Sequence, residues 1–385
     1  MKFINKKKIL HYIQKNPGRS RTEISKALSI SKPTISKLVD ELINEGWFRE
    51  KESSSSSPSG GRRAFQIYFN HNAKYIVGVD IGGTSVEMAV MNLKGDFKEK
   101  VVLSTQEHLS KDLVQIIADN INSLITKSSL ENSQIIGAGI GVPGITDVEK
   151  GIVFDAPSLG WKHYHLVEKL DNLLPFPVYV DNDVNVAALG EQWKGAGKDK
   201  RNILQITLGT GVGCGMIING QLYRGSSFAA GEIGYMVTDK HAAEEAYDSI
   251  FSGYGFLDSH IGGPSITKRM LKHLRTGDEE SDDWPAKRIF ESAIAGDKNA
   301  LNIVDDALSH LAFALINVIS IVNPECVIIG GGLSKSMHHF LPEIMSTIDK
   351  HLPIETSVTI TKLDNVSVLG AAYLVLKEHE SILQV

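Results

Sequence analysis

The chain has 385 residues, enough for two or three domains with separate cores, and its 42% hydrophobic and 22% charged residues are ordinary for a globular protein. It contains no run of about 18 apolar residues, so we expect no transmembrane helix and no membrane partner. Only Cys214 and Cys326 are present, which argues against a disulfide framework or a cysteine-built zinc site and favours the cytosol.

The net charge of −5 conceals a basic N-terminal part and an acidic remainder. Residues 1–74 contain 15 Lys and Arg against 6 Asp and Glu, a balance of +9, and the rest has a balance of −14. We therefore expect only the N-terminal part to meet a polyanion. Charge alone leaves open the alternative of a solvated basic arm that has no partner.

The first 45 residues predict three helices, at about 6–15, 21–28 and 32–45. Ser31 fits an N-cap, and Pro33 fits the first turn of the third helix. The apolar residues of that helix fall on one stripe, so polar side chains near its N-terminal end point outward. The second and third helices, joined by a short turn, have the proportions of a helix-turn-helix.

A low-complexity tract, residues 53–61, interrupts the N-terminal part and fits either an interdomain linker or a loop within one domain. Residues 64–69 after it have a strand-like composition, and Trp47, Phe48 and Arg49 precede it. Two short strands around a Ser/Gly tip would form a wing, so we favour the loop.

A winged helix-turn-helix would place the N-terminal end of its third helix in the DNA major groove, where side chains reach base edges. Other basic side chains would hold phosphates, and arginines at the wing tip would enter the minor groove. The alternative is a small helical interaction domain with a basic loop. The predicted contacts to a double-stranded operator are Arg21, Lys32, Thr34, Ser36, Lys37, Arg62 and Arg63, with Lys26 as a further phosphate contact.

From residue 75 the pattern changes to strand meanders mixed with helices, which indicates two α/β lobes. Repeated strand–glycine turn–strand units suggest an internal duplication. The predicted strands are 76–80, 85–93, 98–104, 135–142, 178–180, 203–208, 213–218 and 326–329, and the predicted helices are 111–125, 300–322 and 369–378.

Three glycine-rich turns, at 80–84, 208–213 and 330–332, each follow an apolar strand. Glycine lets the backbone approach a polyphosphate and exposes N–H donors to it. The Asp80 carboxylate, at the start of the first turn, could hold Mg²⁺ beside those phosphates. None of the turns matches the Walker pattern, and tight structural turns are the alternative.

A polar segment, residues 181–185, follows another predicted strand. A carboxylate at such a strand end can act as a general base toward a sugar hydroxyl, and its neighbouring amide can hold the adjacent hydroxyl. Glu232 offers another acceptor. Capping of the following helix is the alternative role for Asn182 or Asp183.

Taken together, these motifs resemble the ROK family of repressors and sugar kinases over nearly the whole chain. An additional N-terminal winged helix is typical of the repressor branch of that family. The motifs that carry the resemblance are DIGGT at 80–84, GIGVPG at 139–144, NDVNVAALGE at 182–191, TLGTGVGCGMIINGQLYRG at 207–225, AGEIG at 230–234 and IGGGLS at 329–334.

The resemblance implies a winged helix-turn-helix over residues 1–74 and an α/β sugar-kinase-like domain over 75–385. That domain would have the two-lobed, actin-like (ribonuclease H-like) fold, with lobe one at 75–181 plus 369–385 and lobe two at 182–368. ATP, Mg²⁺ and sugar would meet between the lobes, with Asp183 as the catalytic base of a kinase. The implied nucleotide-binding residues are Asp80, Gly82, Gly83, Thr84, Gly209, Thr210, Gly211, Gly330, Gly331 and Gly332, and the implied sugar-binding residues are Gly144, Asn182, Asp183, Glu232, Tyr235 and Asp258.

The chain departs from the family pattern at the zinc site. Tyr235 stands where the family usually has a zinc-binding His, and Ser249, Phe251 and Phe256 stand at the cysteine positions. His241 and His260 lie nearby, but two histidines without thiolates make a poor tetrahedral site. We expect no structural zinc and no metal-binding residues at this position, with Phe251 and Phe256 packing in place of the ion. Asp258 replaces a Glu and is one methylene shorter, which would alter the sugar pocket.

We expect a sugar-responsive DNA-binding regulator, which needs no cofactor for regulation and binds a palindromic operator as a homodimer or homotetramer. The phosphate turns and Asp183 are intact, so the alternative is an ATP- and Mg²⁺-dependent sugar kinase that carries a DNA-binding domain. A protein–protein adaptor would explain neither the basic N-terminal part nor the glycine turns.

Overall fold

The computed structural model describes residues 2–52, 65–109, 111–244, 255–274 and 284–379. Three helices begin the chain, and the second and third start where the sequence predicts. Ser20 and Glu23 form a reciprocal capping box, and the Ser31 side chain accepts a hydrogen bond from the backbone N–H of Thr34. The helices are α1 (Lys2–Lys15), α2 (Arg21–Leu28) and α3 (Lys32–Asn44).

The predicted wing strands pair as an antiparallel hairpin, β1 (Phe48–Glu52) with β2 (Phe65–Phe69). Phe48 pairs with Phe69 at one end of the hairpin, and Glu52 pairs with Phe65 at the other. The tip, including Arg62 and Arg63, lies outside the described residues. The apolar faces of the helices and of β2 form one buried cluster, and this cluster continues into Ile76, Met91 and Ala372 in the rest of the molecule.

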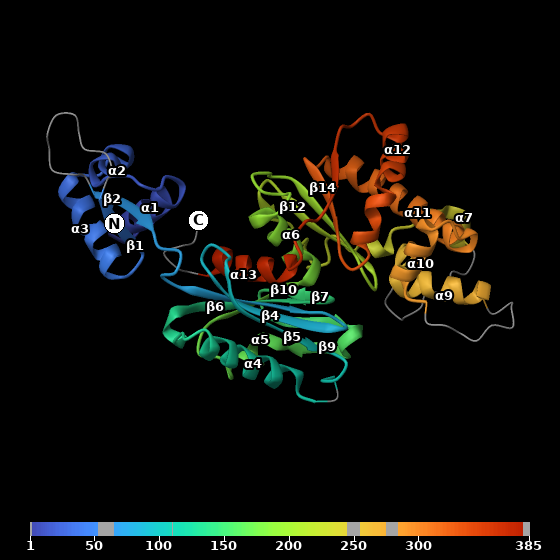
Figure 1. Cartoon of the computed structure of the whole chain (residues 1–385), viewed down its shortest axis with the longest axis horizontal. Coiled ribbons are helices and arrows are strands. Elements are labelled where there is room, and N and C mark those ends of the chain that lie inside the picture. The colour runs from blue at the N-terminus through green and yellow to red at the C-terminus, as the bar shows by residue number, and fades with distance from the viewer. Residues whose placement is uncertain (1, 53–64, 110, 245–254, 275–283, 380–385) are drawn as a thin grey trace.

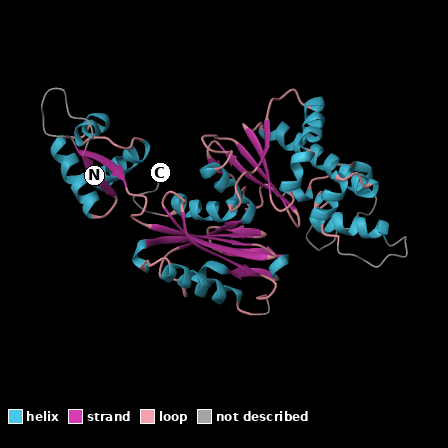
Figure 2. Ribbon diagram, in the orientation of Figure 1, coloured by secondary structure: helices cyan, strands magenta, loops and turns pink. Residues whose placement is uncertain are grey.

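Two five-stranded sheets follow, and Figure 2 shows them lying apart with helices between and around them. The first has the strand order β10-β6-β3-β4-β5, and the second β13-β12-β11-β14-β15. In each, an antiparallel meander continues into two parallel strands, so the two sheets repeat one topology as the sequence suggested. The strands are β3 (Tyr75–Ile81), β4 (Ser85–Asn92), β5 (Phe97–Ser104), β6 (Ile135–Val142), β10 (Val178–Asn182), β11 (Ile203–Leu208), β12 (Val212–Ile218), β13 (Gln221–Leu222), β14 (Cys326–Gly330) and β15 (Ser357–Ile360).

A third, small antiparallel sheet, which the sequence did not predict, joins the end of β6 to β10 along the chain (Figure 1). Its strands are β7 (Ile145–Asp147), β8 (Ile152–Ala156) and β9 (Trp161–His165). The first sheet is covered by α4 (Leu113–Lys127) and α5 (Leu166–Asp171), whose apolar faces belong to its buried core.

Two helices pack closely between the sheets, α6 (Asp183–Lys194) and α13 (Val366–Glu378). A Cβ atom on Gly370 would overlap the carbonyl of Val186, and one on Gly190 would overlap the carbonyl of Val366. Glycine at these positions therefore allows the two backbones to approach each other. Since α6 follows β10 directly and α13 also contacts β3 and β6, the pair connects the first sheet to the second.

Most of the remaining helices form a layer on the second sheet. Among them α11 is long and apolar enough to span a membrane by length and composition, but it is mostly buried in the core beside this sheet. The α-helices are α7 (Lys240–Glu244), α8 (Asp258–Ile261), α9 (Gly263–Leu274), α10 (Ala286–Ile294), α11 (Lys298–Val322) and α12 (Leu341–His351), and the 3₁₀ helices of the chain are η1 (Asn132–Gln134), η2 (Pro157–Leu159), η3 (Ile233–Tyr235) and η4 (Ser334–His339).

Candidate functional site

The outward face of α3 carries the side chains predicted to read DNA. Lys32 and Lys37 are exposed, and Thr34 and Ser36 are partly exposed near the start of the helix. The Thr34 hydroxyl lies 2.8 Å from the hydroxyl of Ser31, so the N-cap holds Thr34 in place. The arrangement suits an approach of the helix N-terminal end to a groove.

Arg21 has a different environment from the other predicted phosphate contacts. Its guanidinium lies 2.7 Å from the Asp40 carboxylate and 2.6 Å from that of Glu50. Although burial opposes it, these two carboxylates raise the pKa of Arg21 above its ordinary value. Arg21 therefore ties α2 to α3 and β1, and its contact with a phosphate stays a prediction.

The first and second glycine turns face each other across a cavity of about 240 Å³ that also contains the predicted sugar-binding residues. Gly83 lies on the side of the first sheet, and Gly209–Gly213 lie on the side of the second. The first turn is tight, since the backbone N–H of Gly82 donates to the carbonyl of Ser85 over 2.8 Å. We refer to this cavity as the interlobe cleft.

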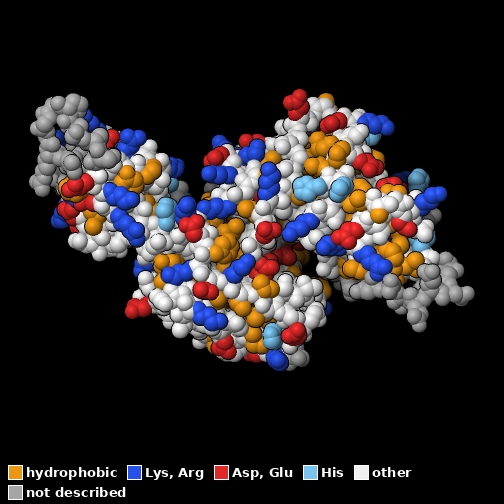
Figure 3. Space-filling model, in the orientation of Figure 1, with side chains coloured by type: hydrophobic (Ala, Val, Ile, Leu, Met, Phe, Trp, Pro, Cys, Tyr) orange, Lys and Arg blue, Asp and Glu red, His pale blue; other side chains and the backbone are white. Residues whose placement is uncertain are grey.

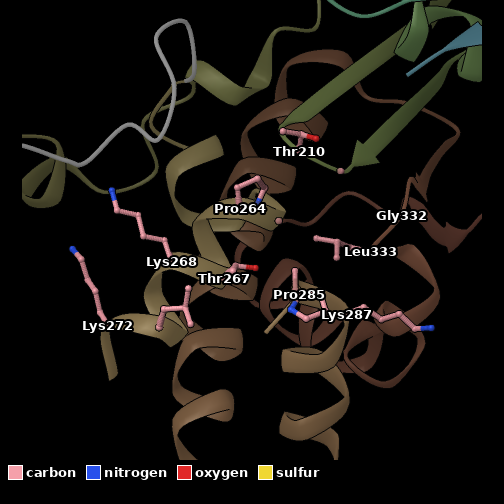
Figure 4. A pocket seen from close by; sticks show the side chains of 13 residues that line it. Thr210, Pro264, Thr267, Lys268, Lys272, Pro285, Lys287, Gly332 and Leu333 are labelled. Atoms are coloured by element: carbon pink, nitrogen blue, oxygen red, sulfur yellow. The ribbon is translucent and has the colours of Figure 1, made fainter. Parts of the chain in front are cut away.

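The third glycine turn joins the second in a separate cavity of about 620 Å³ (Figure 4). Gly331 has a φ of +88°, which only glycine adopts readily, and it packs against Leu208 at the end of β11. Figure 4 shows Lys268 and Lys272 on α9 and Lys287 on α10 around the opening that Thr210 and Gly332 line. We refer to it as the lysine-rimmed cavity.

The polar segment after β10 both caps α6 and lines the interlobe cleft. The Asn182 side-chain oxygen accepts hydrogen bonds from the backbone N–H groups of Val184 and Asn185, at 2.9 and 3.2 Å. Its amide nitrogen donates to the carbonyl of Gly144 over 3.0 Å. The capping role and a role in the cleft are therefore not exclusive, and the adjacent Asp183 reaches the cleft from the first turn of the helix.

Asp183 in the cleft and Asp80 beside it are buried carboxylates, and the charge of Asp183 acts on Asp80. Burial raises the pKa of Asp183 to about 7, with a further rise caused by Glu232. Burial also raises the pKa of Asp80 to about 8, and Asp183 and Glu87 add to the rise. Carboxylates in this state favour a proton or a cation beside them. Asp80 at a glycine turn thus fits an Mg²⁺ ion that is shared with nucleotide phosphates.

Asp258 lines the cleft, but its carboxylate is already engaged by the backbone. One oxygen accepts from Val212 N–H over 2.7 Å, and the other accepts from Gly255 N–H over 2.9 Å. Burial nevertheless raises the pKa of Asp258, and these two bonds oppose the rise. Asp258 therefore fastens the second glycine turn to α8, while Tyr235, at the rim, leaves 53% of its surface exposed.

Phe256 is buried where the family resemblance placed a cysteine. Its ring lies 4.3 Å from that of His260, between centroids, and His260 lies 4.0 Å from His310. In the described parts of the chain, no three His, Cys, Asp or Glu side chains group as a metal ion would require. These residues do not fit a zinc ion, while Ser249 and Phe251 lie outside the described range.

The sequence missed two cleft residues. The Asp155 carboxylate and the Thr207 hydroxyl each contain a buried oxygen without a hydrogen-bond partner among the described residues. Asp155 comes from β8 in the unpredicted small sheet, so no sequence pattern assigned it a place. Thr207 stands one residue before the second glycine turn, and its position there was the signal that could have found it.

The fold and the cleft together define a class of protein: a winged helix-turn-helix joined to a duplicated α/β domain with the architecture of sugar kinases. Solved structures share this architecture. A ROK family transcriptional regulator, described as a homologue of the Escherichia coli MLC protein, covers 96% of this chain and 95% of its own, with a TM-score of 0.79 at 23% identity. A ROK family glucokinase from Streptomyces griseus, in complex with glucose and AMPPNP, covers 78% and 98%, with a TM-score of 0.64 at 27% identity.

The chain belongs to the ROK family, whose model matches residues 76–378, and a winged helix-turn-helix DNA-binding model matches residues 3–49. A xylose repressor from Caldicellulosiruptor bescii is 31% identical over 98% of this chain and 96% of its own length. A glucokinase from Halalkalibacterium halodurans is 33% identical, but it matches 80% of this chain and 97% of its own. The repressor therefore shares nearly the whole of this chain.

Proposed function

We propose that the chain is a transcription repressor whose affinity for operator DNA is set by a neutral sugar bound in the interlobe cleft. The observation that carries the proposal is the presence, in one chain, of a winged helix-turn-helix and a cleft lined by Asn182, Asp183 and Glu232. Similarity to xylose repressors over nearly the full length supports it. Such a protein works in the cytosol, where its operator lies.

The charge of the interlobe cleft favours an uncharged ligand. Four of its residues are carboxylic acids, and no Lys, Arg or His is among the described residues that line it. These acids are Asp155, Asp183, Glu232 and Asp258. The only described charged side chains that a phosphorylated or acidic sugar would meet there are carboxylates, whereas the hydroxyls of a neutral sugar can donate hydrogen bonds to them. The buried oxygens of Asp155 and Thr207 are further acceptors that such hydroxyls would satisfy.

A path of direct packing leads from the cleft toward the DNA-binding domain. Asn182 caps α6, α6 packs on α13, and α13 ends beside the junction of the body with residues 1–74. A sugar that binds better when the two sheets close on it would shift α6 and α13 together. The size of the regulatory effect equals the difference in sugar affinity between the two states.

We further propose that the repressor acts as a homodimer or homotetramer. Two copies would present their α3 helices about 34–36 Å apart, one turn of DNA, to the two halves of a palindromic operator. Two exposed apolar side chains on α11 support the proposal, because Ile321 leaves 81% and Phe313 leaves 39% of its surface exposed. Apolar groups on such a core helix suit a contact between copies.

The test is a fluorescence-anisotropy titration of the full chain on promoter fragments that it selects from genomic DNA. We expect at least one neutral pentose, hexose or N-acetylamino sugar to change the operator Kd by about 5-fold or more. Binding should also weaken steeply with salt, because phosphate contacts release counterions. A chain that prefers no fragment over random DNA, or that no sugar affects, would overturn the proposal.

Sugar kinase activity is a second candidate function, favoured by the intact phosphate turns. Gly209, Thr210 and Gly332 line the lysine-rimmed cavity, which has the size of a nucleotide site, and Asp80 fits Mg²⁺ beside the first turn. Bound MgATP would supply the phosphoryl group. With a pKa of about 7, Asp183 can accept the proton of a sugar hydroxyl held by Asn182 near neutral pH.

For this candidate we expect Asp183→Asn to lower kcat by at least about 100-fold and to preserve sugar binding, because the amide cannot accept the proton. The measurement is coupled ADP release with a panel of neutral sugars, and calorimetry follows sugar binding. Asp112→Asn, an exposed N-cap of α4, is the matched control. Equal turnover by both variants would overturn the role of Asp183 as the base, and no turnover by the unaltered chain would rule the kinase out.

A further inference from the structure

A second large cavity, of about 630 Å³, lies where the DNA-binding domain meets the rest of the molecule. Gln14 at the end of α1 lines one side, and His71 comes from the short connection between β2 and β3. Lys94 belongs to the β4–β5 turn of the first sheet, and Gly220 to the β12–β13 turn of the second. We refer to it as the junction cavity, because three parts of the fold contribute to it.

An aromatic pair forms the wall of the junction cavity. Trp193 at the end of α6 stacks on Tyr373 of α13, with ring centroids 5.2 Å apart and planes within 7°. Lys194 Nζ lies 4.8 Å from the Trp193 ring centroid, and Lys377 Nζ lies 5.5 Å from that of Tyr373. These cation–π contacts hold two ammonium groups in place on one wall.

Positive charge outweighs negative charge around this cavity. The ammonium groups of Lys94, Lys194 and Lys377 line it, opposed by the carboxylate of Glu378, while Asp96 lies close to Lys194. Figure 3 shows Lys and Arg side chains gathered where the N-terminal domain meets the body. Arg224 pairs with Glu378 at 3.3 Å, which reduces the opposing charge further.

The lysines of the junction cavity are crowded. Burial lowers the pKa of Lys194, and the neighbouring Lys94 and Lys198 lower it further, although Asp96 opposes them. Burial likewise lowers the pKa of Lys377. Lys377 also donates hydrogen bonds to Gln192 and to the Gly220 carbonyl, both over 3.2 Å, and so ties α13 to the second sheet. An anion among these groups would relieve their mutual repulsion.

We infer that the junction cavity is a second ligand site, for a small phosphorylated sugar. Lysine ammonium groups suit a phosphate as point charges, and the cavity volume is in the range of about 300–1,000 Å³ common for ligand sites. The amides of Gln14 and Gln221 supply donors and acceptors for hydroxyl groups. The described charged side chains of the interlobe cleft are all acidic, so the cleft and the junction cavity select different ligands: a neutral one and an anionic one.

A ligand at this place touches the DNA-binding domain and both sheets at once. It would fix the end of α1 relative to α6 and α13, and so change how readily two α3 helices match an operator. This regulatory consequence rests on the proposed function. Ligand binding in the junction cavity does not rest on the proposed function, so it can be measured without DNA.

The experiment is isothermal titration calorimetry of the full chain with glucose 6-phosphate, inorganic phosphate and glucose as probes. The first two differ in the sugar ring, and the first and third differ only in the phosphate. We expect glucose 6-phosphate to bind, and the double variant Lys94→Gln, Lys194→Gln to lose at least about tenfold in affinity. Lys377 is left unchanged because of its structural hydrogen bonds.

Lys287→Gln, a lysine at the lysine-rimmed cavity, is the matched control and should bind glucose 6-phosphate as the unaltered chain does. Thermal melting of each variant checks that it folds. Equal binding by the double variant, a loss confined to Lys287→Gln, or no binding of glucose 6-phosphate would overturn the inference. Equal affinity for inorganic phosphate would overturn the assignment of a phosphorylated sugar and leave a simple anion.

Discussion

The carboxylate of Asp183 has both a structural role in α6 and a position in the cleft where it can act chemically. Asp183 begins α6, where one of its oxygens accepts from the backbone N–H of Val184 over 2.9 Å, and it also lines the interlobe cleft. The hydrogen bond lowers its pKa, but burial and the charge of Glu232 outweigh it. The folded protein therefore keeps Asp183 protonated to a higher pH than a solvated aspartate would be.

The pKa of Asp183 predicts a pH-dependent cost in stability. Its ordinary value is 3.8 and its value in the folded protein is about 7, so the folded state binds the proton more tightly than the unfolded state. The contribution of Asp183 to stability therefore falls as pH rises from about 4 to 7. We expect Asp183→Asn to gain in unfolding free energy relative to the unaltered chain over that window, measured by urea denaturation.

The control variant, Asp147→Asn, should change stability in the opposite direction. Although burial raises it, hydrogen bonds from the backbone N–H and ammonium of Lys150 lower the pKa of Asp147. Asp147→Asn should therefore lose stability relative to the unaltered chain at neutral pH, and the loss should disappear at acid pH. A pH-independent difference for Asp183→Asn would show that its environment does not raise its pKa.

Residue types and their spacing predicted several of the side chains that line the cleft, but neither Asp155 and Thr207 nor how each side chain is used. Asn182 and Asp183 were predicted from their position after a strand, and they reach the cleft. The bonds of Asp258 to Val212 and Gly255, and the ion pairs of Arg21, depend on distant segments. No local pattern contains that information.

At the scale of elements, the best-predicted segments have strong local signals. Ser20 and Ser31 fix the starts of α2 and α3 through caps, and long apolar strands such as β6 and β11 match their predicted bounds. The short strands β7–β9 and the helices α8–α10 were not predicted. The strands and α8 are too short to give a strong local signal, and tertiary packing stabilises them. In α9 and α10 the apolar residues fall on one face, and that period was a signal that could have found these two helices.

The crossing of α6 and α13 gives a prediction at this scale. A Cβ atom on Gly370 would overlap the Val186 carbonyl, so Gly370→Ala must push the helices apart. Overpacking of this kind costs about 1–3 kcal/mol, and we expect a lower Tm by thermal denaturation. Gly332→Ala is the control, since no atom lies within 4 Å of its Cβ position. An unchanged Tm for Gly370→Ala would show that the helices pack less closely than described.

At the scale of the whole molecule, the ion pairs of Arg224 connect the two sheets in addition to the contact between α6 and α13. Arg224 follows β13 of the second sheet and lies 2.8 Å from the carboxylate of Asp181, the residue immediately before Asn182. It also lies 3.3 Å from Glu378 at the end of α13, beside the junction cavity. Asp181 is almost completely buried near the end of β10, so its ion pair with Arg224 ties the second sheet to this strand of the first sheet. The interlobe cleft and the junction cavity are therefore connected both by the packing of α6 on α13 and by the ion pairs of Arg224.

The central claim is that a sugar held by Asn182 controls a distant DNA-binding domain. The most direct measurement compares operator affinity with and without the effector for the full chain and for Asn182→Ser. Serine can still cap α6 but cannot donate to the Gly144 carbonyl or hold a sugar hydroxyl as the amide does. We predict equal operator Kd values without sugar, and a sugar response only in the unaltered chain. An undiminished response in Asn182→Ser would contradict the account.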